Sequence, residues 1–205
     1  GLKSYLDKES SGHKEEKILR SLGRVFRFSN TWFLTIAPGG IVGAVLTFSG
    51  LWGVPFLTEV YHLENAIAAT LCSLVMLAWA LSGPIYSLVS ERIQLRRMPY
   101  LIGTMISLIS WSLVFLIPGW SLGILSLLLF LAGFFSGGMI LGFAQGKETL
   151  PLSLSGPVSG VINMGVLTGP MLLQPLVGFL LDSSKPTAHT SVSYTHLTLP
   201  TKQMV

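Results

Sequence analysis

Five long apolar runs, separated by short polar gaps, constrain the fold of this chain more than any other feature of its sequence. A helix needs about 20 apolar residues to cross the ~30 Å hydrocarbon core of a bilayer. In hydrocarbon every backbone N–H and C=O must find a partner within the protein, so an apolar run of this length is expected to be helical. We therefore expect an all-α fold, a polytopic transmembrane helical bundle. Its predicted spans are residues 32–57, 66–89, 100–117, 122–143 and 154–181.

The composition agrees with this class of protein. Half of the residues are hydrophobic and 11% are charged, whereas a soluble domain carries about a quarter charged residues. The mean hydropathy is +0.66. The chain therefore has too few charged residues to cover a surface exposed to water. Cys72 is the single cysteine, which excludes a disulfide framework or a CxxC metal site within the chain. We expect no metal and no cofactor.

The basic residues predict how the chain is oriented. Eleven of the 13 Lys and Arg lie in Gly1–Asn30, Ser90–Pro99 and Ala144–Pro151, which alternate with gaps on the other side. The gap Thr58–Asn65 carries acids and a histidine but no Lys or Arg. Because Lys and Arg mark cytoplasmic loops, the N-terminal segment is expected to be cytoplasmic. The positive charge then indicates a membrane flank, and no nucleic acid partner is expected.

The segments on either side of the membrane domain are predicted separately. Residues 1–29 form a cytoplasmic loop, either as a helix along the membrane interface or as a flexible lead into the bilayer, and residues 30–182 form the transmembrane domain. Residues 183–205 form an external loop and a tail. Within the tail, Val192–Thr201 reads VSYTHLTLPT and resembles a translated sequencing adapter, so we leave it out of the fold. The chain begins with Gly1 and is expected to be an internal fragment.

Three stretches carry a resemblance to a known family. They are Phe48–Leu57 (FSGLWGVPFL), Gly83–Pro99 and Gly160–Asp182. Together they resemble the second half of a major facilitator superfamily transporter, over roughly Ile18–Asp182. The resemblance implies twelve helices in two six-helix halves. The five spans would be helices seven to eleven, preceded by a missing N-terminal half and followed by a missing last helix.

The loop between the second and third spans resembles the second-half copy of the family's loop signature. Its candidate gating residues are Gly83, Glu91, Arg92, Arg96 and Arg97. The resemblance implies that the acid bonds a neighbouring helix end and holds the cytoplasmic side closed in one state. The sequence departs from the signature at Ser87, where Gly is expected, and at Gln94-Leu95, where Gly-Arg is common. A plain positive-inside turn explains the arginines equally well.

Candidate substrate-binding residues are the polar and aromatic side chains inside the spans. No ionisable residue lies mid-span, although such residues are the usual proton or ion carriers. Asn163 and Gln174 are the most costly to place in lipid, so they should face protein or water. One hypothesis is that they hydrogen-bond a solute beside an aromatic wall of Phe48 and Trp52. The alternative is hydrogen bonding between helices.

Glycines four residues apart recur through the spans. The pairs are Gly39/Gly43, Gly133/Gly137, Gly138/Gly142, Gly156/Gly160 and Gly165/Gly169. Small residues on one helix face let two backbones approach closely in lipid. They are expected to serve packing, and smooth faces of this kind could also let helices rock against each other.

The expected function is that of a secondary active transporter, a symporter or antiporter that moves a small solute by alternating access. Its partners are the lipid bilayer, the missing N-terminal half and an unknown solute, and its location is the bacterial inner membrane. If protons are coupled to transport, the titrating group is expected in the first half. The alternative is a membrane sensor that binds a solute without moving it. No enzyme is indicated, since HExxH, GxSxG and GxxxxGK[ST] motifs are absent.

Overall fold

The computed structural model describes residues 20–184. Predictions about the segment before residue 20, the external loop and the adapter-like tail lie outside these residues. Within them the chain is helical and has no strand, and five helical stretches are long and apolar enough to cross a membrane. The expectation of an all-α membrane bundle with five spans is confirmed.

The first and fourth spans are each built from more than one helical piece. The first joins α2 (Ser29–Thr47), a π-helical turn η1 (Phe48–Trp52) and α3 (Gly53–Val60). The second and third are the single helices α4 (Asn65–Ile93) and α5 (Arg97–Leu116). The fourth joins α6 (Leu122–Ser136), the short η2 (Gly137–Met139) and α7 (Ile140–Thr149). The fifth is η3 (Leu152–Leu154) followed by α8 (Ser155–Ser184).

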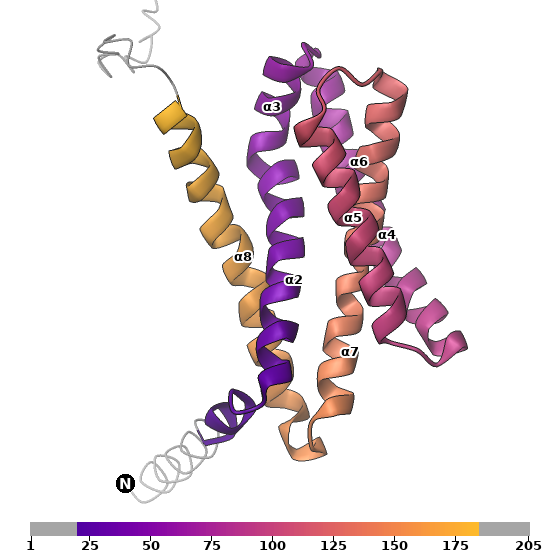
Figure 1. The fold of residues 1–205 in the computed structure, drawn as a ribbon, viewed down its shortest axis with the longest axis vertical. Helices are drawn as coiled ribbons and strands as arrows, with labels where there is room; N and C mark the ends of the chain where they lie inside the picture. The colour runs from indigo at the N-terminus through magenta and orange to yellow at the C-terminus, as the bar shows by residue number, and fades with distance from the viewer. Residues whose placement is uncertain (1–19, 185–205) are drawn as a thin grey trace, which may run out of the picture.

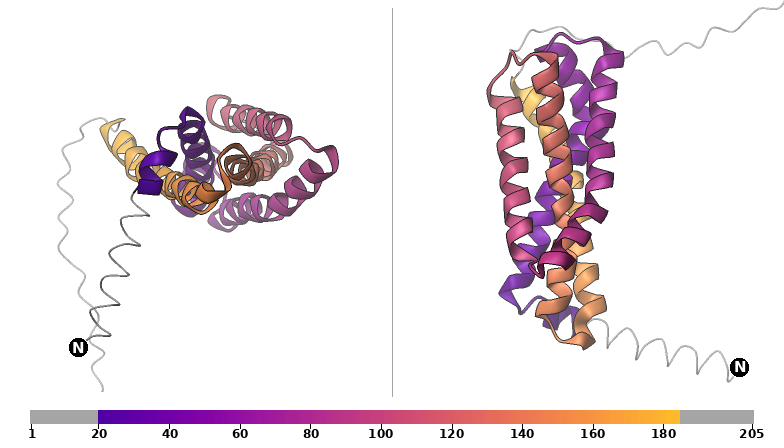
Figure 2. Two further views of the ribbon diagram at one scale, coloured as in Figure 1. Left: turned by 90° about the horizontal axis from the view of Figure 1, so that it is seen from below. Right: turned by 90° about the vertical axis from the view of Figure 1, so that its right-hand side faces the viewer.

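The helices form an elongated bundle in which α4, α5 and α6 group together and α2 pairs with α8 (Figures 1 and 2). The main apolar core lies where α2, η1 and α3 meet α4, α5 and α6, around residues such as Val45, Leu71, Val114 and Leu129. A smaller core around Val25 and Ile162 joins the segment before α2 to the start of α8. The outward faces of the spans are apolar, which suits a lipid environment.

The pairing of α2 with α8 depends on four glycines. A methyl group on Gly39 would overlap the Gly165 backbone, and one on Gly169 would overlap the Gly39 backbone. Gly43 likewise lies against Gly169. Two of the predicted pairs therefore meet each other, backbone to backbone, as small residues do in membrane helix crossings. Figure 1 shows α8 beside the lower part of α2 and diverging from it higher up.

Of the other predicted glycine pairs, two pack against neighbouring helices and one is exposed. Gly133, Gly137, Gly138 and Gly142 each contact a neighbouring helix, at Val75, Ser82, Tyr86 and Pro38 respectively. By contrast, Gly156 and Gly160 on α8 have open space where a side chain would lie. Packing therefore accounts for four of the five pairs, and the fifth lies on an uncovered face of α8.

The turn η1 widens the first span in the stretch that carried part of the family resemblance. The Gly53 N–H donates to the Phe48 carbonyl, five residues back. Pro55 follows, and in a regular α-helix its ring would clash with the carbonyl of Leu51. A single π-helical turn relieves such a clash, and turns of this kind are common at functional sites.

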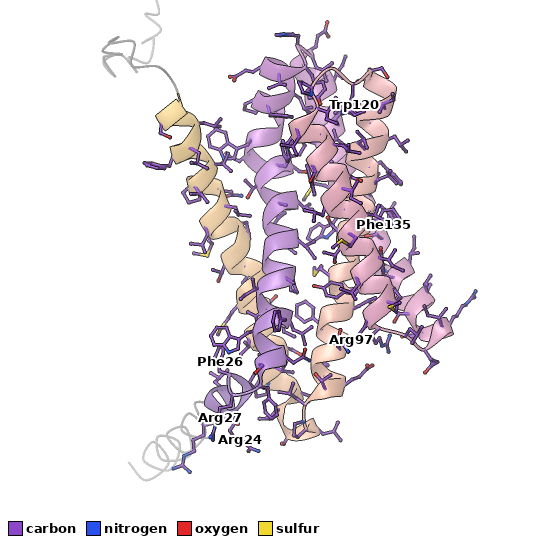
Figure 3. All side chains as sticks on the ribbon, in the orientation of Figure 1. Arg24, Phe26, Arg27, Arg97, Trp120 and Phe135 are labelled. Carbon is purple, nitrogen blue, oxygen red and sulfur yellow. The ribbon has the colours of Figure 1, made fainter. Side chains whose placement is uncertain are left out.

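The two ends of the bundle differ in charge. We call the end that holds the α4–α5 loop, the α7–α8 connection and the start of α2 the basic end. Its basic residues are Arg20, Arg24, Arg27, Arg92, Arg96, Arg97 and Lys147. At the other end Tyr61 donates to the Val114 carbonyl at 3.0 Å and Trp120 to the Leu113 carbonyl at 3.0 Å. Burial raises the pKa of the Tyr61 phenol. Figure 3 labels Trp120 at that end and Arg24 and Arg27 at the basic end.

The glycine crossing makes a stability prediction. Gly169→Ala should lower the free energy of unfolding by about 1–3 kcal/mol, because the added methyl overlaps the Gly39 backbone. Gly160→Ala is the matched control on the same helix. It should be neutral or stabilising by up to about 1 kcal/mol, since it meets open space and Ala favours helix. Thermal unfolding in detergent measures both, and equal effects would contradict the crossing.

Candidate functional site

The loop that resembles the family signature is closed by a left-handed residue. Helix α4 ends at Ile93, and Gln94 has a φ of 54°. Glycine is the usual residue at this position after a helix, because it has no Cβ to be strained. Gln94 adopts the conformation with its side chain bonded back, Nε2 donating to the Glu91 carbonyl at 2.6 Å. The departure from glycine at position 94 therefore leaves the shape of the turn intact.

Arg96 is the loop arginine that binds within the bundle. Its Nε donates to Oε1 of Glu148 in α7 at 3.0 Å, and its Nη1 donates to the Ser90 hydroxyl at 3.2 Å. Ser90 is fully buried and donates to the Leu95 carbonyl at 2.7 Å. Partly exposed ion pairs contribute at most about 1 kcal/mol. The role of this network is therefore to fix the loop against α7.

The other candidate gating residues point to water. Glu91, Arg92 and Arg97 are exposed, and none has an ion pair among the described residues. Glu91 lines a polar groove of about 370 Å³ between α4 and α7, together with Arg96, Lys147 and Glu148. Gly83 has open space beside it. The structure thus joins Arg96 to α7 and leaves the acid free, and the gating role of Glu91 stays a prediction.

The second candidate site lies where α2 and α8 diverge. The Trp52 indole Nε1 donates to the Gln174 carbonyl at 3.1 Å, and its ring packs where Gly178 leaves room. Trp52 and Gln174 are both half-buried. Two residues predicted from sequence to share a solute site are therefore in contact.

The remaining two predicted solute residues lie apart from this contact. Phe48 is 4% exposed, and its ring centroid is 4.9 Å from Trp111 and 5.9 Å from Phe115 of α5. Its place is in an aromatic core between helices. Asn163 is exposed on α8, on the side that no described helix covers.

Two hydroxyl groups beside the π-helical turn were not among the predicted site residues. The side-chain oxygens of Thr47 and Ser49 are buried and have no hydrogen-bond partner among the described residues. Buried polar atoms without a partner are rare and need an explanation. The sequence signal that points to them is the cluster of helix breakers at Gly50, Gly53 and Pro55.

Potential metal ligands are dispersed in this part of the chain. Within residues 20–184 no three His, Cys, Asp or Glu side chains gather where they could hold a metal ion. The polar groups near Trp52 are hydroxyls, carbonyls and an amide. They can exchange hydrogen bonds with a bound solute, and Trp52 can supply an apolar surface.

These features define a multi-pass helical membrane protein in which Trp52 and Gln174 are in contact between two helices. A model of the Major Facilitator Superfamily matches residues 4–187. The chain therefore belongs to the major facilitator superfamily, a family of membrane transporters. Searches of curated protein sequences and of solved structures found no significant match.

The left-handed loop residue yields a second prediction. Gln94→Gly and Gln94→Ala both remove the bond to the Glu91 carbonyl, but only glycine relieves the positive φ. The glycine variant should be more stable than the alanine variant by about 1 kcal/mol. At Ser87, inside α4, the order should reverse, because alanine favours helix. Detergent unfolding of the four variants tests this, and the same order at both positions would refute it.

Proposed function

We propose that this chain forms helices of one half of a secondary transporter that moves a small solute by alternating access. The observation that carries the proposal is an exposed, unpaired amide, that of Asn163, on the uncovered face of α8. Only 11% of that span is buried, against 33–44% for the other four spans. A helix with lipid on most sides should be apolar on those sides. Helix α8 exposes apolar residues such as Met164 and Leu167, but Asn163 and Thr168 are exposed among them.

The two polar residues on this face are not equivalent. The Thr168 hydroxyl donates to the Met164 carbonyl at 2.7 Å, so its polarity is satisfied within the helix. The Asn163 amide has no partner among the described residues. An unpaired amide is costly in hydrocarbon, which favours water or protein beside this face. A second half of the transporter, with a solute path between the halves, meets that need.

The crossing of α2 with α8 suits movement as well as packing. At the glycines the two backbones lie in contact, and Thr35 and Leu173 are the side chains that pack over Gly165 and Gly43. Farther along, Trp52 spans the widening gap to Gln174. The unpartnered hydroxyls of Thr47 and Ser49 belong to the same span as Trp52, three to five residues before it. We infer that this region is the wall of the solute path and that α8 tilts about the crossing during transport.

Orientation and coupling follow from the charges. The basic end faces the cytoplasm under the positive-inside rule, in the inner membrane of a bacterium. The middle of every described span lacks Asp, Glu, Lys, Arg and His. If transport is coupled to protons or another ion, the titrating or coordinating group then lies in the other half.

A flux assay on the complete protein, with both halves, tests the proposed function. Liposomes containing it should accumulate a radiolabelled solute from a panel of sugars, amino acids and carboxylates, with saturable kinetics. Gln174→Ala should weaken the apparent affinity, and Leu108→Ala on the lipid face of α5 should not. Saturable binding without flux would replace transport by the sensor alternative.

Cysteine labelling tests the environment of α8 separately. With the buried Cys72 replaced by Ala, Asn163→Cys should react with a membrane-impermeant maleimide, because water reaches that face. Leu108→Cys is the control: it is 57% exposed in the bundle but should be shielded by lipid. If both positions were equally protected in membranes, the solute path would not lie along this face of α8.

A further inference from the structure

A second cavity lies outside the candidate sites, on the surface that faces lipid. It is an apolar groove of about 350 Å³ near the basic end, between α4, α5 and α6. Its lining includes Ile85, Val89 and Ile93 from α4, Met98 and Ile102 from α5, and Phe135 from α6. Figure 3 labels Phe135 of α6 and Arg97 at the start of α5.

The floor of the groove is fixed by close packing. Tyr86 is 8% exposed, and its ring lies where Gly103 of α5 and Gly138 of η2 leave room. Because neither glycine has a side chain, the ring sinks between the helices and the groove stays open above it. The groove is thus a built feature of the helix packing.

Two exposed arginines adjoin the groove in sequence at its basic end, which we call its mouth. Arg92 directly precedes Ile93, and Arg97 directly precedes Met98, and both of these apolar residues line the groove. Both arginines are exposed and have no ion pair among the described residues, in contrast to Arg96 with Glu148. Two unpaired arginines therefore belong to the residues that adjoin the apolar groove in sequence.

The nearest acid of the loop does not neutralise this mouth. Glu91 lines the polar groove between α4 and α7, together with Ser87. Ser87 and Glu91 are each two residues from Val89, which turns them about 200° around α4 from the apolar groove. Two separate grooves thus flank α4. The polar groove contains Glu91, and the apolar groove has Arg92 and Arg97 as its adjoining charged residues.

We propose that the apolar groove is a binding site for one anionic phospholipid of the leaflet at the basic end. An acyl chain lies along Ile85, Val89 and Ile102, and the phosphate lies between Arg92 and Arg97. Guanidinium groups bind phosphate through paired, charge-assisted hydrogen bonds. Basic pockets between membrane helices favour anionic headgroups, and the two arginines repel the ammonium group of a zwitterionic lipid. This proposal depends on the membrane location alone and stands apart from the transport mechanism.

The test compares phosphatidylglycerol with phosphatidylcholine bound to the purified full chain in mild detergent, counted by native mass spectrometry. The unaltered protein should hold one phosphatidylglycerol at least tenfold more tightly than phosphatidylcholine. The double variant Arg92→Gln/Arg97→Gln should lose about 30-fold in affinity for phosphatidylglycerol, as two cationic contacts imply. Arg24→Gln/Arg27→Gln removes the same charge at the base of α2 and should retain binding.

The groove itself is tested by filling it. Ile102→Trp should abolish phosphatidylglycerol binding, whereas Leu101→Trp should not, because Leu101 is outside the groove although both side chains are 55% exposed. Ile85→Trp replaces Ile102→Trp if the latter does not fold, as judged by thermal unfolding. Equal losses in the two arginine pairs would mean charge attraction without a site. Binding that survives both groove variants, or no preference over phosphatidylcholine, overturns the proposal.

Discussion

The contact between α2 and α8 supports the part of the bundle where function is proposed. In hydrocarbon there is no hydrophobic driving force between helices, so association depends on close packing and hydrogen bonds. Gly39 and Gly169 let the two backbones touch, which gives α8 its main attachment to the described bundle. Away from the glycines, the start of α8 packs in the smaller core around Val25 and Ile162, while Asn163 is exposed and Gln174 contacts Trp52. The four glycines therefore account for the close approach of the two backbones.

The sequence was sufficient to predict the helical architecture, because a helix that crosses the membrane must have a long apolar run. Apolar length predicts spans, and five of them are present. The turn at Gln94 shows why motif matching alone is weaker. The residue differs from the expected glycine, yet the backbone conformation that the glycine would serve is the same. The loop needs a left-handed residue at this position, and Gln94 adopts that conformation in place of glycine.

The candidate site was only partly predictable from residue type. Trp52 and Gln174 share a contact, but it runs from the indole to a backbone carbonyl, which side-chain chemistry could not reveal. Phe48, four residues earlier, packs into the α5 aromatic cluster, because the direction of each side chain depends on how neighbouring helices cross. The π-helical turn between them adds one residue to a helical turn, and no periodicity in the sequence marks such a change. Burial and crossing geometry, set by distant residues, decide these details.

The separation of charge in this bundle bears on its response to voltage. An elementary charge that crosses the whole membrane potential changes energy by about 2.3 kcal/mol per 100 mV. The charges of the described residues lie at the ends of the spans, and the middles of the spans are uncharged. Tilting of α2 or α8 would therefore move almost no charge through the electric field. Any electrogenic step must then come from the solute, a coupled ion or another part of the transporter. The movement of these helices themselves should be nearly independent of the membrane potential.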